Sequence, residues 1–479
     1  MRQSFLFLLL FISAISSFGQ DIQESYPKTY WCPNDSFAIK FKNYPDLTFF
    51  KVSRKDIGSP GTDASPGDYV TIYYGTDSLL ITYHNKIPYA QITYINFASP
   101  KGKTTLRFHY NDVTSYFSKD YMERNEGKVQ YDIPEVYELA NIIWTLSPSG
   151  QRATDLNKRG DYYQKVVSYF KPYLNHPIFK ALDFPDSLYE SQYYDFRENS
   201  FAFNFQDTAK GAEDCKLLFN GPYYYVMGKD LSDSSLFGKL IPLIEDFAVK
   251  SKFRTFYKNN IGFYEREIER EKDLLPVEQM WKWLEVQFAN TDYQSYKVIS
   301  SPLIGGSHST QNYFTPRHPG WFGECVMFIA TTERVDTLNN LSEIQKQALM
   351  SGVVFTEIDH NYVNPVSGKY AISIDSIFSN RSIWAKQGNG SNWYGSPESV
   401  FNEYMTWAVF CLYMLDNYDK PTADLAINER ERRMVEKRNF IKFKEFDQAL
   451  IKIREEHKDL KVADLYPFIL GWCRGEDLK

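Results

Sequence analysis

The spacing of apolar residues changes near residue 125, and this change limits the folds that the chain can adopt. Before it, short runs of alternating apolar and polar residues are separated by turn residues such as Gly58-Ser59-Pro60-Gly61. This pattern is typical of β-strands joined by turns. It predicts a β-rich N-terminal module over residues 20–125, with strands at residues 37–41, 69–74, 78–83, 92–95 and 104–110.

From residue 133 onward, apolar residues recur at the three- and four-residue spacing of amphipathic helices. Pro134 and Glu135 stand where a first helical turn favours them. Further helices are predicted at residues 162–173, 236–257, 278–288, 342–362, 397–415 and 430–458. The charged stretch at residues 429–433 is expected to face solvent. The predicted fold class is therefore α+β, with a mainly helical domain over residues 130–479.

The first 19 residues are expected to be a targeting segment. Arg2 precedes a short apolar run at residues 5–15, and Ser17-Phe18-Gly19 provides small residues at a cleavage position. These features match a secretory signal peptide, so the mature protein is predicted to begin at Gln20 and to be secreted or periplasmic. No later run approaches the roughly 18 apolar residues of a membrane span, so no transmembrane segment is expected.

Charge and cysteine content narrow the classes of partner and site. The chain has 479 residues and a formal net charge of -6, which disfavours nucleic acid as a partner. The expected partner is a peptide or protein, with a glycan as the alternative. The five cysteines show no Cys-x-x-Cys spacing, so they are expected to be buried small side chains and not zinc ligands.

Residues 356–360, with the sequence Thr-Glu-Ile-Asp-His, match the zinc-helix motif His-Glu-x-x-His except at the first histidine. In an α-helix, residues 356 and 360 share one face, which is the geometry that two zinc-binding imidazoles need. In that motif the glutamate, here Glu357, binds and deprotonates the metal-bound water. His360 is therefore a predicted zinc ligand and Glu357 the predicted catalytic base. Asn364-Pro365 is expected to end the helix soon after His360.

A third ligand is expected on the predicted helix at residues 397–415. Val400, Tyr404 and Trp407 form an apolar stripe on it, which predicts burial. A buried carboxylate is costly unless it is paired or binds a metal, so Glu403 is the preferred zinc ligand. Glu398 is better explained as a first-turn residue that the helix dipole favours.

Other side chains are candidates for the missing ligand position. They are Glu357 itself and two histidines among turn residues, His308 and His318, which are expected to be exposed loop residues. Asp359 points about 100° away from His360 on a helix and is a poor candidate. Residues 298–306, upstream of His308, are predicted to form an edge strand that lines a cleft.

Five segments together resemble an uncharacterised family of secreted bacterial proteins. They are residues 134–139, 176–177, 299–303, 357–365 and 438–441. That family looks like the gluzincin-type zinc metallopeptidases, whose motif is His-Glu-x-x-His-x-x-x-Asn-Pro with a later glutamate ligand. The resemblance covers residues 130–479 and rests mostly on Glu357, His360, Asn364 and Pro365. It implies a zincin-like fold, with Glu357 as general base and His360 and Glu403 as zinc ligands.

Thr356 is the departure from that family's motif. A threonine hydroxyl is a weak donor that zinc sites seldom use, so two strong ligands remain where a catalytic zinc has three. Zinc is therefore expected to bind weakly or not at all, and the chain is predicted to be a pseudo-peptidase that binds a peptide or protein. Two alternatives stay open: an active metallopeptidase with a substituted ligand, and a surface protein that binds a glycan or another protein.

Overall fold

A computed structural model divides the chain into two compact units. The first unit comprises Met1–Ser118, Gly221–Leu231 and Tyr313–Phe322, and the second comprises Lys119–Asn220, Ser232–Asn312 and Gly323–Lys479. The structure describes the backbone of the strands between residues 29 and 111, and residues 117–206, 215–219, 225–226, 229–230, 235–288, 293–316 and 321–477. The predicted signal peptide, residues 1–19, and His318 lie outside these ranges.

Paired strands make up the described part of the first unit. β1 (Thr29–Cys32) is parallel to β7 (Gly102–Asn111), which is antiparallel to β6 (Ala90–Ser99). Antiparallel pairs are formed by β2 (Ser36–Ile39) with β3 (Phe50–Ser53), β4 (Asp68–Tyr74) with β5 (Asp77–Tyr83), and β11 (Tyr225–Val226) with β12 (Lys229–Asp230). Each predicted strand run overlaps one of these strands, so the β-rich character of the N-terminal segment is confirmed.

A sheet with the strand order β14-β15-β13-β8 lies mostly in the second unit, apart from Tyr313–Pro316 of β14 and Trp321–Phe322 of β15. Its strands are β8 (Lys128–Asp132), β13 (Ser295–Ser301), β14 (Ser309–Pro316) and β15 (Trp321–Ala330). β13 runs parallel to both β15 and β8, and it is almost entirely buried, as central parallel strands are. The predicted edge strand at residues 298–306 was therefore wrong, because β13 lies between β15 and β8. A separate short pair joins β9 (Phe203–Phe205) to β10 (Leu217–Phe219).

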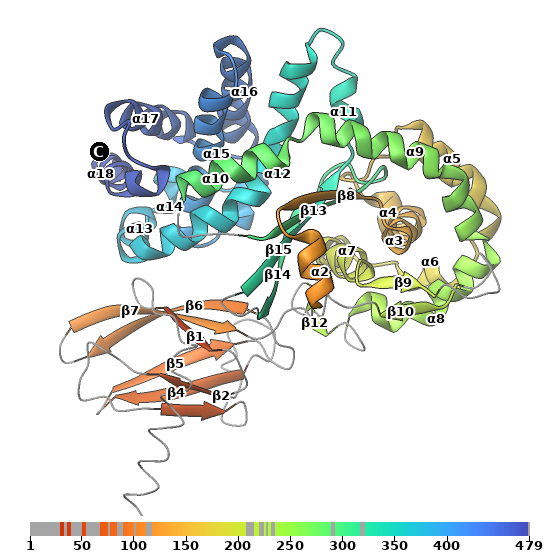
Figure 1. Cartoon of the computed structure of the whole chain (residues 1–479), viewed down its shortest axis with the longest axis horizontal. Coiled ribbons are helices and arrows are strands. Elements are labelled where there is room, and N and C mark those ends of the chain that lie inside the picture. The colour runs from red at the N-terminus through yellow and green to blue at the C-terminus, as the bar shows by residue number, and fades with distance from the viewer. Residues whose placement is uncertain are drawn as a thin grey trace, which may run out of the picture. The chain divides into compact units, whose positions relative to one another are not determined.

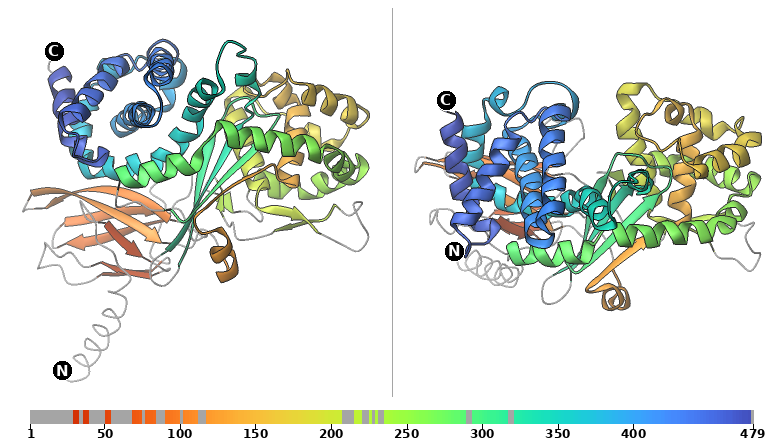
Figure 2. Two further views of the ribbon diagram at one scale, coloured as in Figure 1. Left: turned by 45° about the horizontal axis from the view of Figure 1, so that its top comes forward. Right: turned by 90° about the horizontal axis from the view of Figure 1, so that it is seen from above.

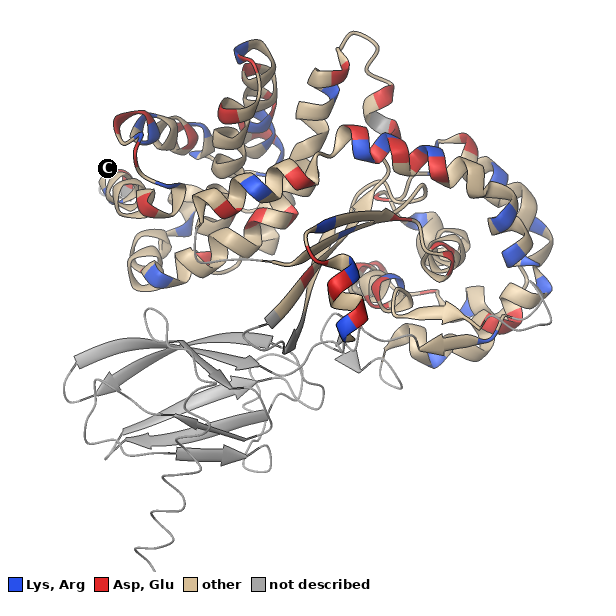
Figure 3. Cartoon of the chain, viewed as in Figure 1, with Lys and Arg blue, Asp and Glu red and all other residues tan. Residues whose placement is uncertain are grey.

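Figures 1 and 2 show two groups of helices at opposite ends of this sheet, with α12 between them. The first group follows α2 (Lys119–Asn125) and comprises α3 (Glu135–Leu146), α4 (Pro148–Arg152), α5 (Asp161–Phe170), α6 (Pro177–Ala181), α7 (Asp186–Ser200), α8 (Leu236–Lys250) and α9 (Phe253–Leu274). After α10 (Val277–Gln287), α11 (Glu333–Asp336) and α12 (Glu343–Ser367), the second group comprises α13 (Ala371–Phe378), α14 (Arg381–Trp384), α15 (Pro397–Asn417), α16 (Lys420–Arg432), α17 (Phe443–Glu456) and α18 (Tyr466–Asp477). Acidic and basic residues are interspersed along α9 (Figure 3).

The helices α12 and α15 are fixed by their first turns and by burial. Each begins with a capping box, Ser342 with Gln345 in α12 and Ser396 with Ser399 in α15, which satisfies otherwise free backbone N–H groups. α15 is buried on all sides from residue 400 to residue 414, and it packs against α12, α13, α16 and α17. A helix that is apolar all round belongs in a core, so α15 is the centre of the second helical group.

Three helix boundaries differ from the prediction. The helix expected at residues 236–257 is split into α8 and α9, because Lys252 adopts a left-handed backbone with φ of 52°. The helix expected at residues 430–458 is split by a π-helical turn, Arg433–Lys437, and by Asn439 with φ of 62°. α12 continues past Pro365 to Ser367, because a proline in the last turn removes only one backbone hydrogen bond.

The fold is a mixture of helix and sheet that is compatible with the predicted α+β class, while its zincin-like character stays a prediction. Within the described ranges, we find no helix with the length and apolar content that crossing a membrane requires. Cys215, Cys325, Cys411 and Cys473 are buried free thiols, as predicted for small core side chains.

Two buried carboxyl groups give the second unit a pH-dependent stability. Glu138 on α3 accepts a hydrogen bond of 2.7 Å from Tyr162, and Glu271 on α9 accepts one of 2.9 Å from Ser300. Burial raises the pKa of each from 4.5 to about 8, so the folded protein keeps both protons at neutral pH.

The free energy of unfolding is therefore expected to fall as pH rises from about 4.5 to about 8, and to level off above that range. The slope is up to about 1.4 kcal/mol per pH unit for each proton that only the folded state retains. Glu138→Gln and Glu271→Gln should each flatten the slope, whereas Glu265→Gln, on the exposed side of α9, should not. Urea denaturation between pH 5 and 8 checks this, and an unchanged slope in both buried variants would contradict it.

Candidate functional site

Helix α12 carries the three motif residues Thr356, Glu357 and His360. Its buried residues, which include Val354 and Ile358, hold it against the rest of the second unit. Thr356 is 5% exposed, whereas the side chain of His360 is 32% exposed. The site is therefore open to solvent at His360 and closed at Thr356.

The predicted ligands His360 and Glu403 lie together in the structure. Nε2 of His360 is 3.9 Å from Oε2 of Glu403 on α15. Nδ1 of the same ring lies 3.4 Å from Oγ1 of Thr406 and 3.5 Å from Oδ1 of Asn364. These two contacts orient the ring so that Nε2 faces Glu403. Oε2 of Glu403 is buried and has no hydrogen-bond partner among the described residues.

The other carboxylate oxygen of Glu403 is already bound by a cation of the protein. Oε1 accepts hydrogen bonds from Nη1 of Arg438 and, at 2.6 Å, from Nε1 of Trp407. Arg438 also donates to the hydroxyl of Tyr394 at 2.8 Å. Burial alone would raise the pKa of Glu403, but Arg438, His360 and the hydrogen bonds outweigh it and hold the pKa below its usual value. Glu403 is therefore an ionised, buried and internally paired carboxylate.

Thr356 is buried and its hydroxyl is held within α12. Its Oγ1 donates to the backbone oxygen of Gly352 at 2.9 Å, one turn earlier in α12. Because the side chain is short and buried, it does not extend toward His360 as an imidazole would.

The residues present do not fit a catalytic zinc with three protein ligands. Two ligands of one tetrahedral zinc lie roughly 3.4 Å apart, somewhat less than the 3.9 Å between His360 and Glu403. Across the described ranges, no three His, Cys, Asp or Glu side chains form a metal-binding group. The donor set is thus one imidazole and one carboxylate that Arg438 already neutralises.

The predicted base, Glu357, is tied to strand β14. Oγ1 of Thr310 donates to Oε2 of Glu357 at 2.9 Å, and Nδ2 of Asn312 donates to Oδ1 of Asn361 at 2.7 Å. Burial raises the pKa of Glu357, and the neighbouring His360 opposes that rise. β14 therefore lies along α12, joined to it by alternate side chains.

The intervening side chains of β14 bind a second helix. Ser309 donates to Oε1 of Glu198 on α7, and Nε2 of Gln311 donates to Oε2 at 2.9 Å. Glu198 is itself paired with Arg197 at 3.1 Å, and both side chains are fully buried. Because side chains alternate across a strand, these contacts fix both faces of β14. Its backbone N–H and C=O groups point sideways, in the plane of the sheet. Among the described strands, only β15 neighbours β14 in that sheet.

Among the described residues, the other candidates from the sequence do not join this pair in a metal-binding group. His308 accepts a hydrogen bond from the backbone nitrogen of Ala330 at 3.2 Å, and it is partly buried, so the expected exposed loop residue was wrong. Burial lowers the pKa of His308 to about 4. Asp359 is fully buried with both oxygens unpartnered among the described residues, and burial raises its pKa well above the usual value. Glu398 lies in the first turn of α15, as predicted.

Sequence reasoning missed the two arginines around Glu403. Arg438 was part of the segment 438–441 but had no assigned role. Arg430 was expected to face solvent with its charged neighbours, yet Arg430 is 8% exposed and Glu431 is 5% exposed. The only sequence signal for this burial is Gly352 in α12. Because glycine has no side chain, it leaves room for the guanidinium of Arg430.

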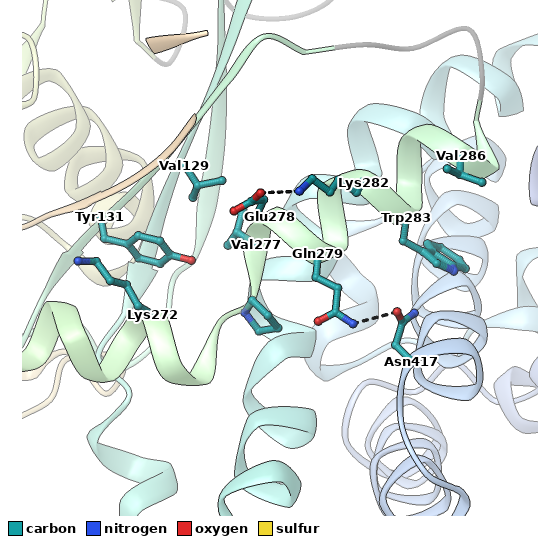
Figure 4. Close-up of a pocket in the computed structure, with 11 residues that line it drawn as sticks. Val129, Tyr131, Lys272, Val277, Glu278, Gln279, Lys282, Trp283, Val286 and Asn417 are labelled. Carbon is teal, nitrogen blue, oxygen red and sulfur yellow. Dashed lines mark hydrogen bonds and ion pairs between the residues drawn. The ribbon is translucent and has the colours of Figure 1, made fainter. Parts of the chain in front are cut away.

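A separate hollow of about 810 Å³ lies elsewhere in the second unit (Figure 4). Residues of β8, α9, α10 and the end of α15 line it, and Nε2 of Gln279 donates to Oδ1 of Asn417 at 2.9 Å across it. None of the motif residues lines this hollow. The chemistry at Glu357, His360 and Glu403 is therefore separate from it.

No protein-family model, curated protein sequence or solved structure matches the chain. The expected likeness to gluzincin-type peptidases therefore rests on the sequence motif alone.

Proposed function

We propose that the chain is an exported pseudo-peptidase, which binds a peptide or an extended segment of protein beside α12 without cleaving it. The observation that carries the proposal is the pairing of Glu403 with Arg438 next to a threonine at the first ligand position. Arg438 supplies the positive charge that a metal would otherwise bring to Glu403. Export is proposed from residues 1–19, which lie outside the described residues.

The end strand β14 is the proposed binding element. An extended peptide that adds to a sheet edge gains main-chain hydrogen bonds, while its side chains contact the surfaces on either side. Residues 309–312 of β14 are held by Glu357 and Asn361 on one face and by Glu198 on the other. A strand fixed in this way loses little conformational entropy when a peptide pairs with it.

Glu357 is not placed to act as a base without a metal-bound water. Its carboxylate accepts from Thr310, and burial raises its pKa. The role we propose for Glu357 is to position β14 against α12. Glutamine keeps an acceptor oxygen for Thr310, so Glu357→Gln should leave peptide binding in place.

The test is a binding assay on the full chain. Peptides selected from a displayed library should bind the wild type with a Kd of roughly micromolar size, measured by calorimetry. Thr310→Tyr, which places a ring between β14 and α12, should weaken binding at least about tenfold, or about 1.4 kcal/mol. The matched Thr310→Ser and the Glu357→Gln variants should bind within about threefold of the wild type.

Mass spectrometry of the same mixtures should find the peptides intact. Equal binding by wild type and Thr310→Tyr would show that β14 is not the binding element. Cleavage that disappears in Glu357→Gln would overturn the pseudo-peptidase.

One observation favours the alternative of a metal-dependent peptidase. Oε2 of Glu403 is buried, unpartnered among the described residues and directed toward Nε2 of His360. That alternative requires stoichiometric zinc in the purified protein, and its loss in both His360→Gln and Glu403→Gln. The glycan alternative stays a prediction, because the side chains of the N-terminal module lie outside the described residues.

A further inference from the structure

Arg430 is a buried cation beside the motif helix. It lies on α16, and its guanidinium carbon is 3.2 Å from the centroid of the Trp407 ring and 5.7 Å from that of Phe410. A Cβ atom at Gly352 of α12 would lie 2.9 Å from Nη2 of Arg430. Only glycine at position 352 leaves this space, so the packing of α12 against α16 is built around the guanidinium.

No acidic side chain neutralises Arg430. Among the described residues it forms no ion pair or hydrogen bond, and its buried Nε has no partner. Glu403, which lies within electrostatic range, is bound by Arg438, and the adjacent Glu431 pairs with Lys444 at 3.2 Å. Neither of these two carboxylates therefore forms an ion pair with Arg430.

The remaining charges near Arg430 are cations. Burial lowers the pKa of Arg430 well below its usual value, and Arg433 and Arg438 lower it further. Stacking on Trp407 offsets part of the desolvation penalty of the buried charge. Burial of the guanidinium remains unfavourable without a counter-ion. An anion bound beside the guanidinium would therefore stabilise the folded protein.

The anion would lie next to the motif. Helical side chains tilt toward the N-terminus, so position 356 covers the turn that contains Gly352. Arg430 contacts that same turn. The threonine at position 356 is short where the metallopeptidase motif has an imidazole.

We propose that Arg430 is the binding residue of a carboxylate site, and that its ligand is a carboxylate of the bound peptide, either the C-terminal group or an acidic side chain. The inference rests on the proposed function for the identity of the partner. A planar guanidinium matches a carboxylate through two parallel hydrogen bonds. Phosphate shares this oxyanion chemistry, and the experiment separates the two.

The site is tested with small anions on the full chain. Thermal unfolding of wild type, Arg430→Met and Arg432→Met is measured in chloride, acetate and phosphate at equal ionic strength. Arg432 is the matched control, because it is exposed and pairs with Glu429 at 2.9 Å. Acetate should raise the Tm of wild type and Arg432→Met in a saturable way, by about 3 °C, and should leave that of Arg430→Met unchanged.

In chloride, Arg430→Met should unfold at or above the wild-type temperature, because an uncompensated buried charge is gone. If Arg430→Met does not fold, Gly352→Ala replaces it, because its methyl group displaces the guanidinium. That variant should bind acetate at least tenfold more weakly than wild type. An equal acetate response in wild type and Arg430→Met, or no response in wild type, overturns the site, and a larger shift in phosphate than in acetate overturns the carboxylate assignment.

A second arm uses peptides and separates this inference from the proposed function. A peptide with a free C-terminal or side-chain carboxylate should bind wild type at least tenfold better than its amide, and Arg430→Met should lose that preference. Acetate stabilisation without any peptide binding supports the carboxylate site and overturns the proposed function. Peptide binding with no difference between acid and amide overturns the inference and leaves the proposed function standing.

Discussion

Replacing Thr356 by histidine is expected to raise the affinity for zinc by a factor of about 100 or more. The new imidazole would stand one turn before His360 on the same helix face and complete a set of three ligands with Glu403. Four-ligand zinc sites contribute about 10–16 kcal/mol, so one ligand accounts for roughly 2.5–4 kcal/mol, and each 1.4 kcal/mol is a factor of ten. Competition with a chromophoric chelator measures the change.

The matched control for this variant is Thr356→Gln. Glutamine has nearly the length of histidine but is a poor zinc ligand, so it reports any effect of size alone. Thr356→His combined with His360→Gln should return zinc affinity to the wild-type level. A folded Thr356→His protein with unchanged affinity would show that residues 356, 360 and 403 do not form a zincin-like site.

Replacing Arg438 by methionine is expected to lower the free energy of unfolding by about 3 kcal/mol. The change leaves Glu403 as a buried carboxylate without its cation. Breaking a buried pair on one side costs about 3–5 kcal/mol, and the lower end applies because the Arg438 side chain is 25% exposed. Urea denaturation at pH 7 gives the value.

Two further variants isolate the pair. Arg432→Met, which removes an exposed arginine from its contacts with Glu429 and Glu436, should cost less than about 1 kcal/mol. Arg438→Met with Glu403→Leu should recover most of the loss, because both buried charges are then gone. If Arg438→Met costs no more than Arg432→Met, Arg438 does not substitute for a metal at Glu403.

Local patterns in the sequence predicted much of the frame of the site. The helices that carry Thr356, His360 and Glu403 follow from apolar spacing and from first-turn residues, and these signals lie within one segment of chain. Glu403 was found because a carboxylate on an apolar helix requires a partner. The partner itself was not assigned, because Arg438 follows a π-helical turn and a left-handed Asn439 that no local pattern predicted.

The order of the strands was the main feature that the sequence could not supply. Residues 298–306 were expected to form an edge strand that lines a cleft, yet β13 lies between β15 and β8. Such pairing depends on contacts between distant segments. The burial of Arg430 was not predicted for the same reason. A charged run is usually solvated, whereas the burial of Arg430 depends on its contact with Gly352 on another helix.

The most direct measurement is peptide cleavage by the wild type in the presence of excess zinc. A mixture of peptides is incubated with wild type and with Glu357→Gln, and the products are read by mass spectrometry. We predict that every peptide stays intact in both samples. Cleavage by the wild type that is absent in Glu357→Gln would contradict a pseudo-peptidase and establish a metal-dependent enzyme.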